Sequence, residues 1–272
     1  MNKGSTIFER KRSDMSIFQQ LIKSIYSPET IAKFRMAKIG RTIGYVFLLM
    51  LIASIPMIIS ISMFMSGLFQ AGDQYLDDLP DFSIENGTLQ SDEDAPVIDD
   101  DDDMTVIFDS TGELQVEDLE EYGNLVALLE RELVFVAGAN ADVIAYQDFG
   151  IDFSKSDLTG FYSTLSDLSF LIIGLVIVVV YLFNTGLKFI GIFTLSLIAL
   201  AMKSSQAPQL KYRHCWVLAA YTVTLPTLLF ALLEALGILI PFQFVIYWVI
   251  AAVMMNLVLR HVPKPKEPQM PQ

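Results

Sequence analysis

The chain has 272 residues, 53% of them hydrophobic, and a formal net charge of −13. A soluble domain has about 45–50% apolar residues. The excess here is gathered in a few long uncharged runs, which is typical of membrane proteins. The single cysteine, Cys215, excludes an intramolecular disulfide.

The charge is divided by position. Residues 73–167 hold 26 acidic and 2 basic side chains, a net charge of −24, whereas the rest of the chain has a net charge of +11. An acidic middle between basic flanks indicates a segment held on one side of a membrane and anchors held on the other. Because Lys and Arg in short loops mark the cytoplasmic face, we expect the basic flanks inside the cell.

Residues 1–42 predict amphipathic, basic helices on the cytoplasmic side. Apolar residues recur at helical spacing from Ile17 to Tyr26. In "SPET", Ser27 is a candidate N-cap and Pro28 suits the first helical position. These residues form either an in-plane interfacial helix on anionic lipid or an ordinary packed helix pair.

Residues 43–69 carry no charge and predict the first transmembrane helix, since a span needs about 20 apolar residues. Pro56 is expected to kink this helix.

Residues 70–164 predict a small, β-rich α+β domain on the extracytoplasmic side. In "FSIENGTLQ", Asn86-Gly87 indicates a hairpin with a type I′ turn. "MTVIFDSTGEL" indicates a strand followed by a turn at Asp109 to Gly112. Further strands are expected towards Phe153, although residues 116–132 suit a helix as well.

Residues 165–202 are membrane-embedded by composition, but they are too long for one span. Phe170 to Met202 contains one charge, Lys188, and as a single helix would be about 50 Å long against a hydrocarbon core of about 30 Å. We therefore expect two segments that divide at residues 184–188. The second segment, Phe189 to Met202, is expected to be re-entrant or shallow.

The remaining residues predict a basic cytoplasmic linker at 203–214, transmembrane helices at 215–238 and 239–260, and a proline-rich extended tail at 261–272. Pro226 and Pro241 are expected to kink these helices. Four crossings keep every basic cluster inside, and a fifth crossing is the alternative. The predicted fold is a mainly α-helical bundle of four or five transmembrane helices with the β-rich domain inserted.

The aspartate run Asp99 to Asp103 raises the question of a metal site. Asp99, Asp101 and Asp103 are the candidate ligands, because Ca²⁺ takes six to eight oxygen atoms. The run lacks the alternating ligands, glycine and final glutamate of an EF-hand. Consecutive like charges favour a solvated loop instead.

Glu234 is the acidic residue of the later apolar spans, and an intramembrane carboxylate is a functional candidate. Glu234 and Asn184 are our candidates for transport or coupling, with bonding between helices as the alternative for Asn184. The sequence contains no phosphate-binding glycine loop, HExxH or CxxC motif. We expect no enzyme, no cofactor and no nucleic-acid partner.

Four stretches resemble a bacterial membrane family of unknown function, some members of which are labelled maltodextrose utilization protein MalA. These stretches are "IFQQLIKSIYSPETIAKFR", "VIFDSTGEL", "FNTGLKFIGI" and "YRHCWVLAAYTVTLPTLLFALLEALGI". "AYTVTLP" is also similar to a segment of Yip-family membrane proteins. The resemblance implies a link to maltodextrin uptake and transfers no site residues.

The sequence therefore predicts a multi-pass protein of the bacterial plasma membrane that contacts the lipid bilayer and a membrane-protein partner. Its expected role is accessory or regulatory, linked to maltodextrin uptake. The alternatives are a transporter component with a path near Glu234, or a sensor of cations or envelope conditions through the acidic domain.

Overall fold

The computed structural model describes residues 15–100, 104–138 and 140–263. The chain forms two compact units. The helical unit runs up to Met63 and resumes at Ile173, and the β unit is Phe64–Ile172. Most of the predicted proline-rich tail lies outside the described residues.

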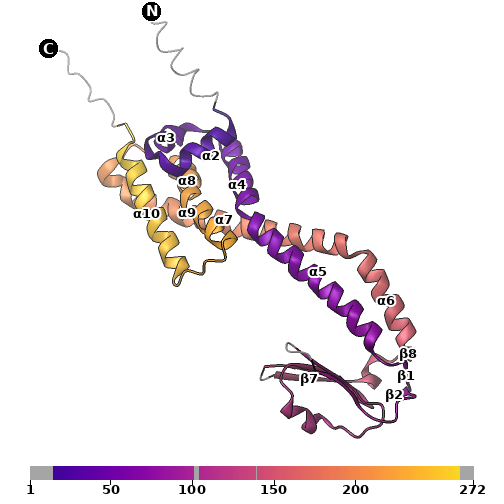
Figure 1. The fold of residues 1–272 in the computed structure, drawn as a ribbon. Coiled ribbons are helices and arrows are strands. Elements are labelled where there is room, and N and C mark those ends of the chain that lie inside the picture. Colours follow the sequence, from indigo (N-terminus) through magenta and orange to yellow (C-terminus); the bar gives the residue numbers. More distant parts are fainter. Residues whose placement is uncertain (1–14, 101–103, 139, 264–272) are drawn as a thin grey trace, which may run out of the picture. The chain divides into compact units, whose positions relative to one another are not determined.

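The helical unit is built from helices (Figure 1), and the first two described ones begin at recognisable sequence signals. Ser16 and Gln19 form a reciprocal capping box at its first described helix. Ser27 caps the next helix with Pro28 in first position, which confirms the prediction from "SPET". The helices are α2 (Ile17–Tyr26), α3 (Pro28–Lys33), the 3₁₀ turn η1 (Phe34–Met36), α4 (Ile39–Ala53), α8 (Tyr212–Thr222), α9 (Thr224–Ala235), α10 (Gln243–Arg260), and the portions of α5 (Ile55–Asp78) and α7 (Ser169–Gln206) that fall within the unit.

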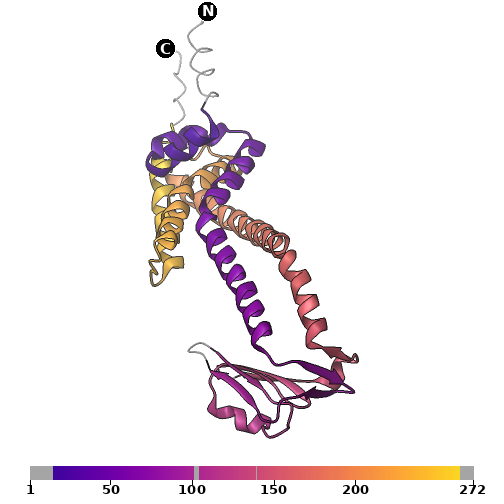
Figure 2. The ribbon, with the colours of Figure 1, turned by 45° about the vertical axis from the view of Figure 1, so that its right-hand side comes forward.

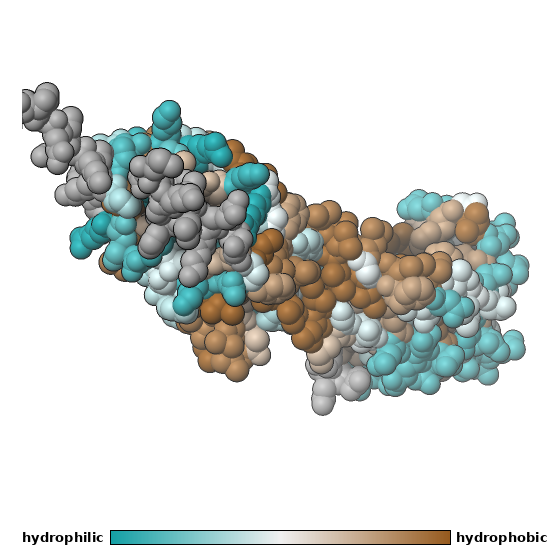
Figure 3. All heavy atoms as spheres, turned by 90° about the horizontal axis from the view of Figure 1, so that it is seen from above, coloured by the Kyte–Doolittle hydropathy of each residue, from teal (hydrophilic) through white to brown (hydrophobic). Residues whose placement is uncertain are grey.

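Four helical stretches of the described chain are long and apolar enough to cross a membrane. They are Ile55–Asp78, Ser169–Lys203, Tyr212–Ala235 and Gln243–Arg260. Apolar residues cover much of the surface in the middle of Figure 3. A helix that exposes so much apolar surface needs an apolar environment, which is consistent with a membrane protein.

The predicted first span, residues 43–69, is divided in the structure. Helix α4 ends at Ala53 and α5 begins at Ile55, with a turn at Ser54. Proline has no backbone N–H to donate, so Pro56 leaves the carbonyl of Ile52 without its usual helical partner. The candidate span is therefore shifted to Ile55–Asp78, and α4 is a shorter apolar helix.

The predicted division of Phe170 to Met202 is wrong, because α7 runs without interruption through residues 184–188. Asn184 supports its own helix, since its Nδ2 donates to the carbonyl of Val180 at 2.9 Å. Gly186 is tolerated within the helix, and no proline interrupts it. Length relative to a bilayer does not break a helix whose backbone bonds are all made.

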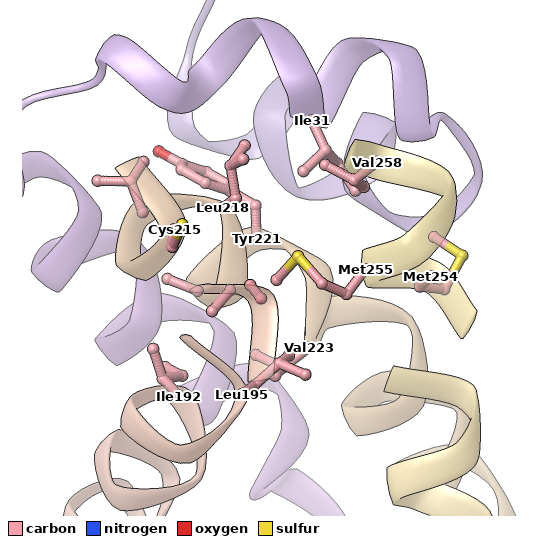
Figure 4. Packing of buried hydrophobic residues seen from close by; sticks show 14 of the residues in the cluster. Ile31, Ile192, Leu195, Cys215, Leu218, Tyr221, Val223, Met254, Met255 and Val258 are labelled. Carbon is pink, nitrogen blue, oxygen red and sulfur yellow. The ribbon is translucent and has the colours of Figure 1, made fainter. Parts of the chain in front are cut away.

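The core of the helical unit joins the N-terminal helices to the last spans (Figure 4). Ile31 on α3 packs close to Val258 on α10, and both are fully buried. The Tyr221 hydroxyl donates to Gln20 Oε1 at 2.8 Å, and its ring lies 4.3 Å from that of Tyr45. Helices α2 and α3 therefore form a pair that packs on the rest of the helical unit. The pair lies at the end of this unit opposite the α9–α10 connection (Figure 2).

The packed pair still exposes an apolar row on α2. Phe18, Ile22 and Tyr26 are each more than half exposed, and they recur at i, i+4 and i+8 on the helix. Packing uses the other face, on which Gln20, Leu21 and Ser24 are buried. The interfacial alternative remains a prediction for this exposed row.

The β unit contains two sheets and a closing helix, α6 (Lys155–Asp167). The strands are β1 (Phe82–Glu85), β2 (Thr88–Ser91), β3 (Val97–Asp100), β4 (Thr105–Phe108), β5 (Leu125–Leu128), β6 (Glu132–Ala137), β7 (Asn140–Ala145) and β8 (Phe153–Ser154). The sheet orders are β2-β1-β8 and β3-β4-β5-β6-β7, and among the described strand pairs β4–β5 is parallel and the others are antiparallel. Two 3₁₀ turns, η2 (Val116–Glu121) and η3 (Tyr146–Phe149), connect strands.

Two predicted turns of the β unit are confirmed. Asn86 and Gly87 have φ of 49° and 74° and join β1 to β2, as a type I′ hairpin requires. After β4, Asp109 is fully buried and accepts hydrogen bonds from the backbone N–H groups of Thr111 and Leu114. Over residues 116–132 the chain forms η2 and β5, so the strand prediction is confirmed for residues 125–128 and the alternative of a helix over the whole range is wrong.

Candidate functional site

A cavity of 250 Å³ lies between the helices of the helical unit. Each contributing helix presents residues at the i, i+3, i+4 or i+7 spacing that defines one helical face. The lining comprises Met50, Ala53, Ser54 and Met57 around the α4–α5 junction, Asn184 and Lys188 on α7, Thr227, Phe230, Ala231 and Glu234 on α9, and Gln243 and Tyr247 on α10. We call this space the Lys188 cavity.

Lys188 is the central group of the Lys188 cavity. Its Nζ donates to Thr227 Oγ1 and to the Tyr247 hydroxyl, at 3.1 Å each. Those two oxygens are themselves 3.2 Å apart. The ammonium also lies 4.6 Å from the centre of the Tyr247 ring, in a cation–π position. Three candidate spans therefore meet at one lysine.

The Lys188 charge has polar neighbours but no counter-ion. No carboxylate forms an ion pair with it in the described part of the chain, whose two salt bridges lie elsewhere. An ammonium carries three donors, and two of them are used. A lysine deep in a membrane helix costs about 2.5–3.5 kcal/mol, so an anionic group in this cavity would be stabilised by the unneutralised charge.

The opening of the Lys188 cavity lies at the α9–α10 connection. Gln243 is the first residue of α10, and Tyr247 lies one turn further along that helix. Glu234 is the last residue but one of α9, and Thr227 lies two turns before it. Glu234 and Gln243 are exposed, whereas Thr227 is buried. Lys188 thus contacts the buried Thr227, and the carboxylate of Glu234 lies at the open end.

A second cavity of 540 Å³ adjoins the first one. The two share Met50, Asn184, Lys188, Gln243 and Tyr247 in their linings. The second cavity adds the aromatic rings of Phe244 and Trp248, which lie 6.2 Å apart. Lys188 can therefore meet a solute that also contacts amide and aromatic groups.

The structure brings Glu234 and Asn184 together in the lining of one cavity. Lys188 was not predicted as a site residue, since its position indicated only where the membrane segment was expected to divide. The signal was present, because Lys188 is the one charge within a long apolar run. Thr227 and Tyr247 carry no such signal, and only the packing of α9 and α10 against α7 places them.

The three prolines lie at helix starts. Pro56 is the second residue of α5, Pro226 is the third residue of α9, and Pro241 lies in the turn before α10. Such positions suit proline, since the first turn of a helix has no use for its N–H.

The candidate metal ligands do not form a cluster within the described part of the chain. Asp99 is exposed on β3, and Asp101 and Asp103 lie outside the described residues. The neighbouring Asp100 accepts a hydrogen bond from Thr105 Oγ1 at 2.7 Å. Over residues 15–100, 104–138 and 140–263, no three His, Cys, Asp or Glu side chains gather in a way that could hold a metal ion.

Comparison with known proteins places the chain in a family and gives no activity. Neither a curated protein nor a solved structure matches the chain. Residues 18–259 match the family model described as "Protein of unknown function (DUF1189)". That match covers all four candidate spans, except the last residue of the fourth, and the whole β unit. The chain therefore belongs to the DUF1189 family of proteins of unknown function.

Proposed function

We propose that this protein binds a small solute with an anionic group in the Lys188 cavity and carries or senses it at the membrane. The observation that supports this most directly is the ammonium of Lys188, hydrogen-bonded by Thr227 and Tyr247 yet not paired with a carboxylate in the described chain. Charge-assisted hydrogen bonds to a carboxylate or phosphate oxygen would complete its donor set.

Glu234 gives the site a direction. The carboxylate lies at the open end and would repel an anion as long as it is ionised. A solute that enters with a proton, or after Glu234 takes one, avoids this repulsion. The proposed role of Glu234 is therefore coupling, and that of Lys188 is binding. Sodium or proton gradients are the driving forces to compare.

The proposed orientation places the N-terminus in the cytoplasm of a bacterium, because Lys and Arg are concentrated before the first span. The α9–α10 connection, at the opposite end of the helical unit from α2 and α3, is then extracytoplasmic. Residues 70–164 would be extracytoplasmic as well. The Lys188 cavity would open to the outside of the plasma membrane.

Flux into proteoliposomes tests the proposal. We expect uptake of radiolabelled succinate or phosphate by the full chain under an imposed proton gradient, with maltose as the neutral comparison solute. Lys188→Met should abolish uptake, and Glu234→Gln should uncouple it from the gradient. Lys38→Met is the matched control, because Lys38 is an exposed lysine outside the cavity. Equal uptake by all four proteins would remove the Lys188 cavity from the function.

An accessory role is a second proposal, supported by the compact β unit and its charge. Residues 64–172 fold as a unit of their own, and residues 73–167 carry a net charge of −24. A separate charged unit suits docking to another membrane protein, and a maltodextrin transporter is the partner that the sequence resemblance suggested. Gentle-detergent pull-down from native membranes, quantified against a mock preparation, should recover a stoichiometric transporter. A preparation without a stoichiometric partner would contradict this role.

A further inference from the structure

The five-stranded sheet of the β unit is apolar on both faces. One face carries Ile107, Leu125, Ala127 and Val134, which are buried against Leu119 of η2. The alternate residues of the same strands point to the other face, because side chains alternate along a strand. That second face carries Val106, Val126, Leu128, Leu133 and Phe135. A sheet with two apolar faces needs a cover on each.

The second face of the sheet lines a cavity of 930 Å³. Its other walls come from the last turns of α5, from β1 and β8 of the smaller sheet, from η3 and from α6, and they are almost wholly apolar or aromatic. Binding sites for small molecules range over about 300–1,000 Å³, so this space is large for a domain of its size. We call it the β-unit cavity.

One polar group in the β-unit cavity lacks a partner. Tyr146 lines the cavity and is 2% exposed, and its hydroxyl makes no hydrogen bond to any described residue. Burial, and to a lesser degree the charge of Glu132, raise the pKa of the Tyr146 hydroxyl. The group is therefore a neutral donor, and leaving a buried donor without an acceptor is unfavourable. A ligand oxygen that accepts this hydrogen bond would remove the cost.

Charge decides which kind of apolar ligand fits. Asp157 is the carboxylate in the cavity lining. Hydrogen bonds from the side chain and backbone of Ser154 lower its pKa, so it is ionised. The surrounding residues 73–167 have a net charge of −24. A fatty-acid anion or an anionic lipid headgroup would be repelled, whereas a neutral or zwitterionic lipid would not.

The walls also point to the source of the ligand. Gly72, Tyr75 and Leu76 of α5 line the β-unit cavity and belong to the candidate span Ile55–Asp78. Phe161 of α6 and Ile151 are more than half exposed at the same cavity. A cavity that is walled by a membrane-spanning helix and rimmed by exposed apolar side chains suits a molecule that comes from the bilayer.

From these observations we infer that the β-unit cavity binds an acyl chain of a neutral or zwitterionic membrane lipid, whose ester carbonyl accepts a hydrogen bond from Tyr146. This goes beyond the solute site at Lys188 and shares no residue with it. The acyl chain covers the second face of the sheet, and the β unit becomes a lipid-binding or lipid-sensing unit.

Photo-crosslinking tests this inference on the full chain in nanodiscs. The probe is phosphatidylcholine with a diazirine in its acyl chain, and the adducts are mapped by mass spectrometry. We expect adducts on β4 to β6, at the peptide that contains Val126. The same probe built on phosphatidylglycerol should label this peptide several-fold less. Adducts confined to the transmembrane helices, or equal labelling by the two lipids, would overturn the inference.

Two variants separate binding from folding. Val126→Trp fills the cavity and should abolish the β-strand adducts. Val143→Trp is the matched control on β7, because Val143 is 46% exposed and does not line the cavity. Tyr146→Phe keeps the volume and should lower labelling by the ester lipid several-fold, while leaving hydrogen exchange of the sheet as in the parent. A crosslinked dimer through this face without lipid adducts would assign it to a second copy of the chain and overturn the inference.

Discussion

The two units expose opposite kinds of surface. In the helical unit α7 and α10 expose many apolar side chains beside an apolar core, and Lys188 meets Thr227 and Tyr247 between the helices. Among the described residues of the β unit most carboxylates are exposed, and the buried polar groups are Asp109, Thr105 and the Tyr146 hydroxyl. The exposed apolar surface suits lipid and the exposed carboxylates suit water, so the two units differ in what they expose and share an apolar interior.

The buried polar groups of the two units also differ in how completely they are satisfied. Asp109 Oδ1 accepts from the backbone and hydroxyl of Thr111, and Oδ2 accepts from the Leu114 backbone. Lys188 makes two of its three hydrogen bonds and has no counter-ion in the described chain. A satisfied charge is a structural element, whereas an incompletely satisfied one is available to a ligand.

The largest expected effect comes from removing the satisfied charge. Asp109→Ala removes the buried charged acceptor of three hydrogen bonds and should destabilise the β unit by about 4 kcal/mol. Hydrogen exchange of β4 and β5 amides should rise accordingly, while α8 to α10 should exchange as before. Glu113→Ala, at an exposed position in the same turn, is the control. Equal effects of the two substitutions would refute the structural role of Asp109.

A comparable but smaller loss is expected in the core of the helical unit. Ile31→Ala removes a fully buried side chain that packs near Val258, and should weaken the packing of α2 and α3 by about 3 kcal/mol. Hydrogen exchange of α2 and α3 measures this loss. Ile22→Ala is the control, since Ile22 is 55% exposed on α2. If both variants behaved like the parent, the N-terminal pair would not be held by this packing.

Acid should lower the stability of the β unit more than that of the helical unit. Burial opposes ionisation of Asp109, but hydrogen bonds from Thr111, Leu114 and Gly112 outweigh it and lower the pKa of the carboxyl. A carboxyl whose pKa is lower in the folded state stabilises the fold above its unfolded pKa of about 3.9. This contribution is lost as the pH falls below that value through the folded pKa. Exchange in β4 and β5 should therefore rise below about pH 4 in the parent and stay flat in Asp109→Ala.

Glycine substitutions give the smallest expected effects. The change in stability should have opposite signs in the two units. Gly87 has φ of 74°, and a Cβ there would lie 2.4 Å from Gln147 Cγ, so Gly87→Ala should destabilise the β unit by about 2 kcal/mol. Gly186 lies in α7 with no other atom within 4 Å of a Cβ, so Gly186→Ala should stabilise by about 0.5 kcal/mol. Thermal unfolding of each variant decides. Stabilisation by both would contradict the turn geometry.

Much of the fold could be predicted because local signals dominate it. The Asn86-Gly87 dipeptide requires positive φ and so fixes a hairpin. Four apolar runs of sufficient length correspond to four candidate spans. These features depend on backbone conformation or on composition over one segment, and both can be read from sequence.

The errors came where a local rule competed with a wider one. The expectation that α7 divides near Lys188 weighed helix length against bilayer thickness, but hydrogen bonding along the backbone carries the helix through. One helix over residues 43–69, kinked at Pro56, was expected. The chain instead makes a turn at Ser54 and begins a new helix at Ile55. Bilayer thickness limits where a helix lies and does not determine where it ends.

The candidate site could be predicted only in part. Glu234 and Asn184 were found because polar residues within apolar spans are rare. Lys188 has the same signal, but its partners Thr227 and Tyr247 are separated from it by 39 and 59 residues. Those distances along the chain close only through helix packing. The apolar second face of the β sheet could not be predicted either. Each strand is a short apolar run, and such a run does not show that its two faces have different neighbours.

The central claim is that Lys188 binds an anion and is not a structural lysine. Titration calorimetry of the full chain in nanodiscs with succinate tests it most directly, using the parent, Lys188→Met and Lys38→Met. We predict binding by the parent and by Lys38→Met, and at least a tenfold loss of affinity, about 1.4 kcal/mol, in Lys188→Met. The thermal stability of Lys188→Met should stay close to that of the parent. Two results would contradict the claim. One is unchanged succinate binding by Lys188→Met. The other is no succinate binding by the parent, together with a loss of fold in Lys188→Met.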